Sequence, residues 1–477
     1  MKYQSTRGGV TNLTFEEAIF SPGYVADGGI LMPQNIPHLS QQELQEMSSL
    51  SYVGLLKRII PMFISKDEIP ETDLQDLFSK ALEKLSLEDV VKLAELKNGL
   101  NVLELFHGKT LAFKDIAISF VGQFMDYFLS KKKKHVTLVV GTSGDTGSAA
   151  IHGVCDSNWI DIVVLLPHGH CTEIQELQMT TVIKENVHVF SVDGSSDDLD
   201  VAIKKVCLDI KFRDQHKLGT MNSINWGRVM VQVVHYFYAY FSQATKVGDP
   251  VEVIIPTGAL GNCTAGCLAV KMGLPLRLVC AVNKNDIVHR AFSTGDYSIS
   301  GLKETISPAM NIQIAYNIER ILWLFSDGDC NLVSKILVQF ESSTPSTTAI
   351  PQDLLCKIQE VVSSGVVDDD TTLKTMTNCW QENNYLLCPH TAVAVAYYYR
   401  NSNSEKERPK SVCIASASPA KFPETVLKAG LTPSVAKEIS GLKTMPTKYT
   451  KMTKTDDWEC MLRDRIISIT EKKKCTS

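Results

Sequence analysis

The feature of this sequence that most constrains its fold is a series of short apolar segments, each followed by a turn and then by a segment of helical character. These segments are Val136–Val140, Ile162–Leu166, Val187–Val192, Val251–Ile255 and Leu276–Val282. Their length and their lack of alternating polar residues are typical of strands buried on both faces. Strands that alternate with helices form βαβ units, so the pattern predicts an α/β fold with parallel sheets. Ligands bind at the carboxyl ends of strands in such sheets.

Length and composition limit the class of protein further. The chain has 477 residues, which predicts two or three domains at roughly 100–200 residues each. Apolar residues make up 44% and charged residues 21%, the balance of an ordinary globular protein. A formal net charge of −5 argues against nucleic acid or an acidic membrane surface as the main partner.

The chain shows no segment that targets or anchors it to a membrane. It has no apolar segment of signal-peptide type near its start and no run of roughly 20 apolar residues. The 13 cysteines are scattered and odd in number, which is typical of reduced thiols. Cys263 and Cys267 lack a second Cys or His pair at zinc spacing, so we expect no metal site. We expect a cytoplasmic protein that is a monomer or a homodimer.

Lys114 is the first candidate for a catalytic group. It stands in the segment LFHGKTLAFKD (105–115), and a helix that begins near it carries Ala117, Ile118, Val121 and Met125 on the same face. Burial on this apolar face lowers the pKa of a lysine, and a neutral amine is what condensation with an aldehyde requires. The alternative is a lysine whose charged end reaches solvent from the first helical turn.

Two glycine-rich turns follow predicted strands. The first, Gly141–Gly147, contains Ser143, Asp145 and Thr146, and the second contains Gly258, Ala259, Leu260, Gly261 and Asn262. Small residues at the start of a helix let backbone N–H groups approach an anion, so a carboxylate or phosphate would fit either turn. Neither turn matches a nucleotide-binding fingerprint. The alternative for both is a tight connection between strand and helix.

A third predicted strand ends in the segment SASPAKFP (416–423). A serine hydroxyl at this strand end, such as that of Ser416, could form a hydrogen bond with a heterocyclic nitrogen. The alternative is ordinary turn chemistry, in which serine bonds to its own backbone.

Taken together, these segments resemble the threonine synthase family, in the fold-type-II group of enzymes that use pyridoxal 5'-phosphate (PLP). The family motifs occur in the same order over more than 400 residues: STR (5–7), FEEAI (15–19), DGGILMP (27–33), LFHGKTLAFKD, GTSGDTGSAA (141–150), MNSINWGR (221–228), PTGALGN (256–262), PHTAVA (389–394) and SASPAKFP. The resemblance implies a tryptophan synthase beta-like fold with an N-terminal threonine synthase-type domain (1–95), a PLP-binding catalytic region of two subdomains (96–430) and a peripheral C-terminal segment (431–477).

The resemblance also implies roles for individual residues. Lys114 is the lysine that carries PLP and moves protons at the substrate. The loop Gly258–Asn262 holds the cofactor phosphate, and Ser416 places a hydroxyl against the pyridine nitrogen. The candidates for contact with the substrate are Ser143, Asp145, Thr146, Asn222, Ser223, Asn225 and Arg228, with Arg228 as a phosphate clamp.

The sequence departs from the family pattern at three places. The family usually has Pro where Lys109 stands, Gly-Asn-Phe-Gly-Asp where this chain has Gly258–Asn262, and Thr and His where Ser416 and Ser418 stand. These positions lie around the expected substrate site. The departures therefore bear on the outcome of the reaction more than on the binding of the cofactor.

The pattern is most similar to the threonine synthase-like branch of the family, which implies a phospho-lyase. Such an enzyme removes phosphate from O-phosphothreonine or O-phosphohomoserine and gives 2-oxobutyrate, ammonia and phosphate, with some activity on O-phosphoserine expected. The first alternative is a threonine synthase, which converts O-phosphohomoserine and water to threonine. The second is an inactive homologue that serves as a binding or signalling protein, and the third a nucleotide-dependent enzyme.

Overall fold

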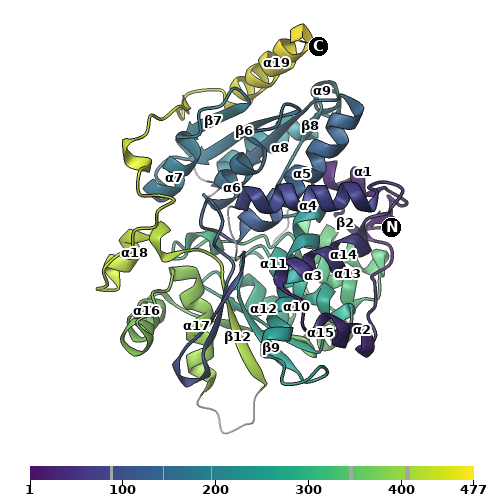
Figure 1. Ribbon diagram of the computed structural model, residues 1–477. Helices are drawn as coiled ribbons and strands as arrows, with labels where there is room; N and C mark the ends of the chain where they lie inside the picture. The colour runs from purple at the N-terminus through teal and green to yellow at the C-terminus, as the bar shows by residue number, and fades with distance from the viewer. Residues whose placement is uncertain (86–89, 143, 195, 343–347, 403–408, 477) are drawn as a thin grey trace.

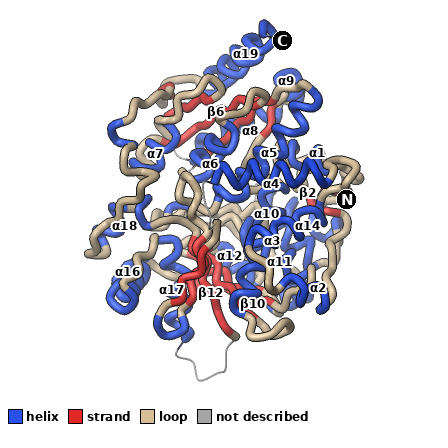
Figure 2. The backbone as a smooth tube through the Cα atoms, viewed as in Figure 1, coloured by secondary structure: helices blue, strands red, loops and turns tan. Residues whose placement is uncertain are grey.

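The protein was analysed as a computed structural model. The structure describes residues 1–85, 90–142, 144–194, 196–342, 348–402 and 409–476. Two parallel sheets form its framework, in separate halves of the molecule (Figure 2). The five segments predicted to be strands are all strands, and the α/β prediction is confirmed.

The larger sheet has six strands in the order β11-β10-β9-β12-β4-β3. They span Val362–Val366 (β11), Leu276–Val282 (β10), Val251–Pro256 (β9), Lys410–Ala415 (β12), Asn101–Glu104 (β4) and Lys92–Glu95 (β3). The first five run parallel, and β3 is an antiparallel edge strand. The strands β9 and β12 are neighbours, so the turns that follow them lie next to each other at one edge of the sheet.

The smaller sheet has five parallel strands in the order β13-β7-β6-β5-β8. They span Thr450–Met452 (β13), Val187–Val192 (β7), Ile160–Pro167 (β6), Val136–Gly141 (β5) and Leu218–Gly219 (β8). The helices that belong to this half are α6 (Asp145–Val154), α7 (Glu173–Thr180), α8 (Ser196–Leu208) and α9 (Ile210–His216). The C-terminal helix α19 (Trp458–Thr476) packs against α8 at the top of the molecule in Figure 1.

The N-terminal part forms a small unit that packs on the rest of the chain. The strands β1 (Tyr3–Ser5) and β2 (Leu31–Pro33) form a two-stranded antiparallel sheet, with helix α1 (Phe15–Phe20) between them in the chain. Three further helices come after β2: α2 (Gln41–Met47), α3 (Tyr52–Ile59) and α4 (Glu71–Leu85). Thr14 and Ser40 begin α1 and α2 with capping boxes, in which each hydroxyl accepts from the N–H three residues on.

Two long helices connect the N-terminal unit to both sheets. These are α5 (Lys114–Lys132) and α10 (Trp226–Gln243), which pack against each other. The predicted apolar face of α5 is buried, from Ala117 to Phe128. Lys131 and Lys132 lie in the last turn of this helix, and Lys133, in the left-handed conformation, is its C-cap. Cations at the carboxyl end of a helix offset its dipole, so this segment has a local structural role.

The remaining helices surround the larger sheet. They are α11 (Gly261–Lys271), α12 (Ile287–Thr294), α13 (Ile318–Phe325), α14 (Cys330–Glu341), α15 (Gln352–Gln359), α16 (Asp369–Asn383), α17 (Pro389–Ser402) and α18 (Pro423–Lys428). A continuous apolar core runs from the N-terminal helices through α5 and α10 to both sheets. Within the described ranges, no helix is long and apolar enough to cross a membrane.

Candidate active site

Lys114 stands at the start of α5, next to the end of β12. The backbone N–H of Phe113 donates to the carbonyl oxygen of Ser416 (2.9 Å), and Ala112 forms a bridge with Ala417. These contacts fix the position of the helix start against the strand end. The Lys114 side chain is 15% exposed, and its Nζ lies 3.2 Å from Oδ2 of Asp145.

Asp145 belongs to the first glycine-rich turn and is buried. Its Oδ1 accepts a hydrogen bond from Nε2 of Gln175 (2.8 Å) and lies 2.8 Å from Nζ of Lys421. Burial by itself would raise the pKa of Asp145. The ammonium groups of Lys421 and Lys114 outweigh this effect and hold the pKa well below its usual range. The carboxylate is therefore ionised between two lysines.

Burial lowers the pKa of Lys114, which is the direction predicted from the apolar face of α5. Asp145 opposes this effect, whereas the positive charges of Arg228 and Lys421 add to it. The amine of Lys114 is thus neutral over a wider pH range than that of an exposed lysine. A neutral amine can condense with an aldehyde and can accept a proton from carbon.

The second glycine-rich turn connects β9 to α11. Its backbone N–H groups, from Gly258 to Cys263, have no hydrogen-bond acceptor among the described residues. Leu260 adopts a left-handed conformation (φ 62°) as the N-cap of α11. A Cβ at Gly258 would lie 3.2 Å from the carbonyl oxygen of Ala309, so this position leaves little room for a side chain. Free donors at the start of an 11-residue helix suit a phosphate group.

The side chain of Asn262 is held by two hydrogen bonds to α10. Tyr236 donates its hydroxyl to Oδ1 of Asn262 (2.8 Å), and Nδ2 of Asn262 donates to Oε1 of Gln232 (2.9 Å). Both partners lie on α10, one helical turn apart. They hold the turn in place, and the turn offers its backbone rather than this amide to an anion.

Arg228, also on α10, is a buried cation without a charged partner. One of its terminal nitrogens donates to the carbonyl oxygen of Met221 (3.0 Å), while its Nε has no hydrogen-bond partner among the described residues. No carboxylate of those residues forms a salt bridge with it, and burial lowers its pKa to about 10. An uncompensated buried guanidinium is costly, and an anion would satisfy it.

A cavity of about 1770 Å³ brings most of the predicted residues together. Lys114, Asp145, Thr146, Asn222, Ser223, Arg228, Gly258, Ala259, Leu260, Gly261, Asn262 and Ser416 all line it. Asn225 is not among the lining residues, because its side chain caps α10 and donates to the carbonyl oxygen of Ile19 (2.8 Å). Ser143 lies outside the described residues. The cavity offers an amine, backbone phosphate donors, a strand-end hydroxyl and a guanidinium, which fit a phosphorylated aldehyde together with a second anion.

Sequence reasoning gave no role to three polar residues of this site: Lys421, Gln175 and His390. The imidazole of His390 lines the cavity, and its Nε2 accepts from the N–H of Ala309 (3.2 Å). Burial lowers the pKa of His390 to about 4, so the ring is neutral near pH 7, with its proton on Nδ1. His390 and Lys421 belong to the family motifs PHTAVA and SASPAKFP, but the sequence alone does not show which side chains point into the protein.

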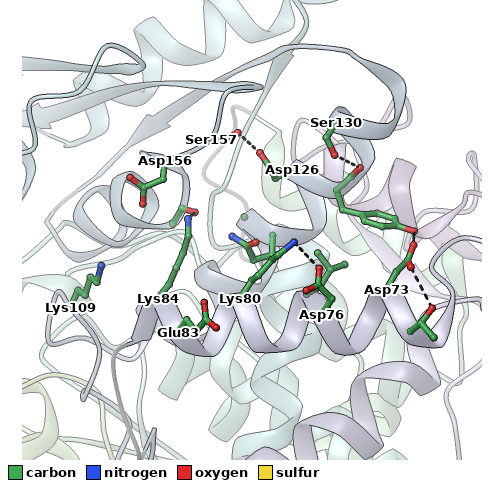
Figure 3. A pocket seen from close by; sticks show the side chains of 16 residues that line it. Asp73, Asp76, Lys80, Glu83, Lys84, Lys109, Asp126, Ser130, Asp156 and Ser157 are labelled. Atoms are coloured by element: carbon green, nitrogen blue, oxygen red, sulfur yellow. Dashed lines mark hydrogen bonds and ion pairs between the residues drawn. The ribbon is translucent and has the colours of Figure 1, made fainter.

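A second hollow of about 770 Å³ lies on the other side of α5, between α4 and α6 (Figure 3). Its charged groups largely satisfy one another: Lys80 pairs with Asp76 (2.7 Å), Lys84 donates to the carbonyl oxygen of Gly153 (2.8 Å), and Tyr127 donates to Asp73 (2.7 Å). Lys109, one of the departures from the family pattern, lines this hollow and not the large cavity. The Lys114 cavity is therefore the candidate active site.

Solved enzymes share this fold. The structure matches a PLP-bound threonine synthase from Brucella melitensis with a TM-score of 0.90 and 34% sequence identity, over 98% of each chain. It matches threonine synthase from yeast with a TM-score of 0.90 and 33% identity, over 99% of each chain. The fold is accordingly that of fold-type-II PLP enzymes.

Sequence comparison gives the same result. The family model for the threonine synthase N terminus matches residues 2–82, and the model for the threonine synthase C-terminal region matches residues 391–461. A human protein named threonine synthase-like 2 is 50% identical over 98% of this chain and 97% of its own length. The chain belongs to the threonine synthase family.

Proposed function

We propose that this chain is a PLP-dependent phospho-lyase, which eliminates phosphate from O-phosphothreonine, from O-phosphohomoserine, or from both. The observation that carries the proposal is that two sets of anion-binding groups lie in one cavity with the Lys114 amine. The free N–H groups of Gly258–Cys263 suit the cofactor phosphate, and the unpaired guanidinium of Arg228 suits the phosphate of a substrate.

PLP supplies the electron sink that makes a carbon–hydrogen bond next to an amino group acidic. Lys114 accepts the α proton at its Nζ, because burial lowers its pKa and so favours the neutral amine. Arg228 binds the leaving phosphate and stabilises the negative charge that develops on it. Ser416 lies at the end of β12 and offers a hydroxyl to the ring nitrogen. A hydroxyl leaves that nitrogen largely unprotonated, which suits elimination.

The products follow from the substrate. Elimination from the β carbon of O-phosphothreonine or from the γ carbon of O-phosphohomoserine gives phosphate and, after hydrolysis, 2-oxobutyrate and ammonia. A threonine synthase goes one step further, because it adds water to the β carbon and releases threonine. Adding that water requires a positioned base, and this chain has Ala259 where the family usually has Asn and Ser418 where it usually has His.

Threonine synthase is the second candidate. It is favoured by the close match to the two solved threonine synthases over nearly the whole chain. The retained Lys114 and phosphate turn favour both enzymes over a binding or signalling protein without catalytic activity. The cavity takes a small phosphorylated amino acid in either case.

The purified protein with PLP is incubated with O-phosphohomoserine, O-phosphothreonine and O-phosphoserine in turn. We expect phosphate, ammonia and 2-oxobutyrate from the first two, and slower release of phosphate and pyruvate from the third, because a pocket that accepts the extra methyl group discriminates by only about 1–3 kcal/mol. Threonine as the main product would establish the synthase instead.

The cofactor is tested separately from turnover. Borohydride reduction of the protein with PLP is expected to label one peptide, the one that contains Lys114, and the label is lost in Lys114→Ala. Lys84→Ala is the matched control, since Lys84 lines the second hollow and its substitution leaves the Lys114 cavity unchanged. Absence of a label at Lys114 in the wild type would exclude the proposed cofactor role.

A further inference from the structure

Lys421 is a buried lysine that does not line the active-site cavity. Its side chain is completely inaccessible (0% exposed), and its Nζ lies 2.8 Å from Oδ1 of Asp145. The same Nζ donates to the carbonyl oxygen of Thr110 (2.6 Å). Lys421 lies in the short turn after β12, so it comes from a different part of the chain than Asp145 and Lys114.

A network of hydrogen bonds around Thr110 fixes the position of Lys421. Thr110, whose carbonyl oxygen accepts from Lys421, donates its own N–H (2.8 Å) and hydroxyl (2.6 Å) to the two oxygens of Asp115. Gln178 donates to the same Thr110 carbonyl (3.1 Å). A buried ammonium is tolerated only when it is paired and hydrogen-bonded, and both conditions are met here. Lys421 thus has one well-defined place beside Asp145.

The two oxygens of Asp145 consequently have different partners. Lys421 and Gln175 take Oδ1, which leaves Oδ2 for Nζ of Lys114 (3.2 Å). We propose that Lys421 is a positioning residue: it locks the Asp145 carboxylate so that one oxygen faces Lys114, and thereby sets where the free Lys114 amine rests and how readily it takes up a proton. This inference rests on the proposed function, in which Lys114 is the cofactor lysine.

The charged and titratable groups around Lys421, Asp145 and Lys114 determine whether loss of Lys421 raises or lowers the pKa of Lys114. Lys114 feels the charges of Asp145, Arg228 and Lys421, and His390 feels those of Asp145, Lys114 and Lys421. Lys421 in turn acts on Asp115, His152 and Cys171. Replacing Lys421 by a neutral residue removes a like charge from Lys114 and leaves the whole charge of Asp145 to it. Both changes favour protonated Lys114, so the pKa of Lys114 rises.

The test measures the protonation of Lys114 directly, without turnover. The full-length chain, freed of cofactor, is treated with trinitrobenzenesulfonate, which reacts only with neutral amines. Mass spectrometry follows the peptide that contains residue 114 as a function of pH. We expect Lys421→Met to move the midpoint of Lys114 labelling to higher pH and to slow labelling several-fold at a fixed pH below that midpoint. Asp145→Asn should move the midpoint to lower pH.

Three further variants separate positioning from packing. Lys421→Arg keeps the charge and should return the midpoint toward that of the wild type, whereas a role in filling space alone would make Arg and Met behave alike. In the double variant Lys421→Met/Asp145→Asn, the part of the upward shift that acts through Asp145 should disappear, which leaves only the direct loss of the Lys421 charge. Lys443→Met is the matched control: Lys443 is exposed and pairs with Glu173 (2.6 Å), so its loss should leave the midpoint unchanged.

A midpoint that stays in place or falls in folded Lys421→Met overturns the proposal. If this variant does not fold, as judged by circular dichroism, Asp145→Asn and Lys421→Arg decide: a midpoint in Asp145→Asn at or above the wild-type value also overturns it. Borohydride labelling with PLP is run on the same samples. A wild type that shows no PLP label at Lys114 refutes the proposed function, whereas the labelling shifts test Lys421 independently of that result.

Discussion

The two glycine-rich turns are similar in sequence but differ in how they satisfy their own backbone. In the turn after β5, Oγ1 of Thr142 accepts hydrogen bonds from the N–H groups of Gly144 (3.0 Å) and Gly147 (2.9 Å). In the turn after β9, the N–H groups of Gly258–Cys263 have no acceptor within the described part of the chain. Both sequences suit an anion, but Thr142 takes two donors of the first turn, whereas the second turn keeps this run of donors for a ligand.

The first turn contributes a charged side chain instead. It places Asp145 at the first position of α6, between Lys114 and Lys421. A glycine-rich turn can thus serve an active site in two ways, by exposing backbone donors or by bringing a carboxylate close to other groups. Substitutions in each turn test this division of roles.

The largest effect is expected for Asp145→Asn in the first turn. The substitution leaves two buried ammonium groups without a counter-charge, and breaking a buried ion pair from one side costs about 3–5 kcal/mol. We expect the free energy of unfolding in urea to fall by about 3 kcal/mol at pH 7, since Lys114 can release its proton and the amide keeps some hydrogen bonds. A loss below about 1 kcal/mol would contradict the assigned charge pairing.

The pH dependence of this difference has a definite sign. The pKa of Asp145 is held below its usual value, so its stabilising contribution is complete above the unfolded-state pKa of about 3.9 and is lost as the pH falls below that value. The difference in unfolding free energy between wild type and Asp145→Asn should therefore stay constant from pH 7 to pH 5. Urea titrations at several pH values measure it.

The next largest effect is expected at Thr142, which accepts hydrogen bonds from two backbone N–H groups of the first turn. Thr142→Val removes the acceptor of two buried N–H groups and should lower the free energy of unfolding by about 2 kcal/mol. The matched control lies in the second turn, where Thr257 donates its hydroxyl to the carbonyl oxygen of Ile255 (2.9 Å) and forms a hydrogen bond with the thiol of Cys280, a weak partner. Thr257→Val should cost about 1 kcal/mol or less. Equal losses in the two variants would remove the distinction between the turns.

The second turn is tested by its affinity for PLP. Gly258→Ala places a Cβ 3.2 Å from the carbonyl oxygen of Ala309 and pushes the turn out of position. We expect the Kd for PLP to rise about tenfold, the equivalent of about 1.4 kcal/mol, as measured by absorbance titration. Gly441→Ala is the control, because nothing lies within 4 Å of the added Cβ at that exposed position.

The smallest effect is expected at the end of β12. Ser416→Ala removes one neutral hydrogen bond to the cofactor ring, worth about 1 kcal/mol, and should raise the Kd for PLP by about fivefold. Ser418→Ala serves as the comparison, since its hydroxyl accepts from the N–H of Ala420 within its own turn. A larger effect at Ser418 than at Ser416 would place the ring contact elsewhere.

Much of the site could be predicted because it depends on local pattern. The apolar spacing after Lys114 predicts a buried helical face, and the apolar residues of that face, among them Ala117, Val121 and Met125, are buried. The glycines of PTGALGN predict a turn with exposed donors, which the free N–H groups agree with. Asn225 was expected near the substrate, but its side chain caps α10, a role that the sequence Asn-Trp-Gly allows equally well.

The order of strands and helices, the turns between them and the amine at the start of α5 follow from the sequence, since periodicity and small residues act over a few neighbouring positions. The pairing of Lys421 with Asp145, the contacts of Asn262 with α10 and the lack of a counter-charge for Arg228 among the described residues emerge only when the chain is folded. Charges interact through space, so their partners depend on how distant segments pack and not on their spacing along the chain.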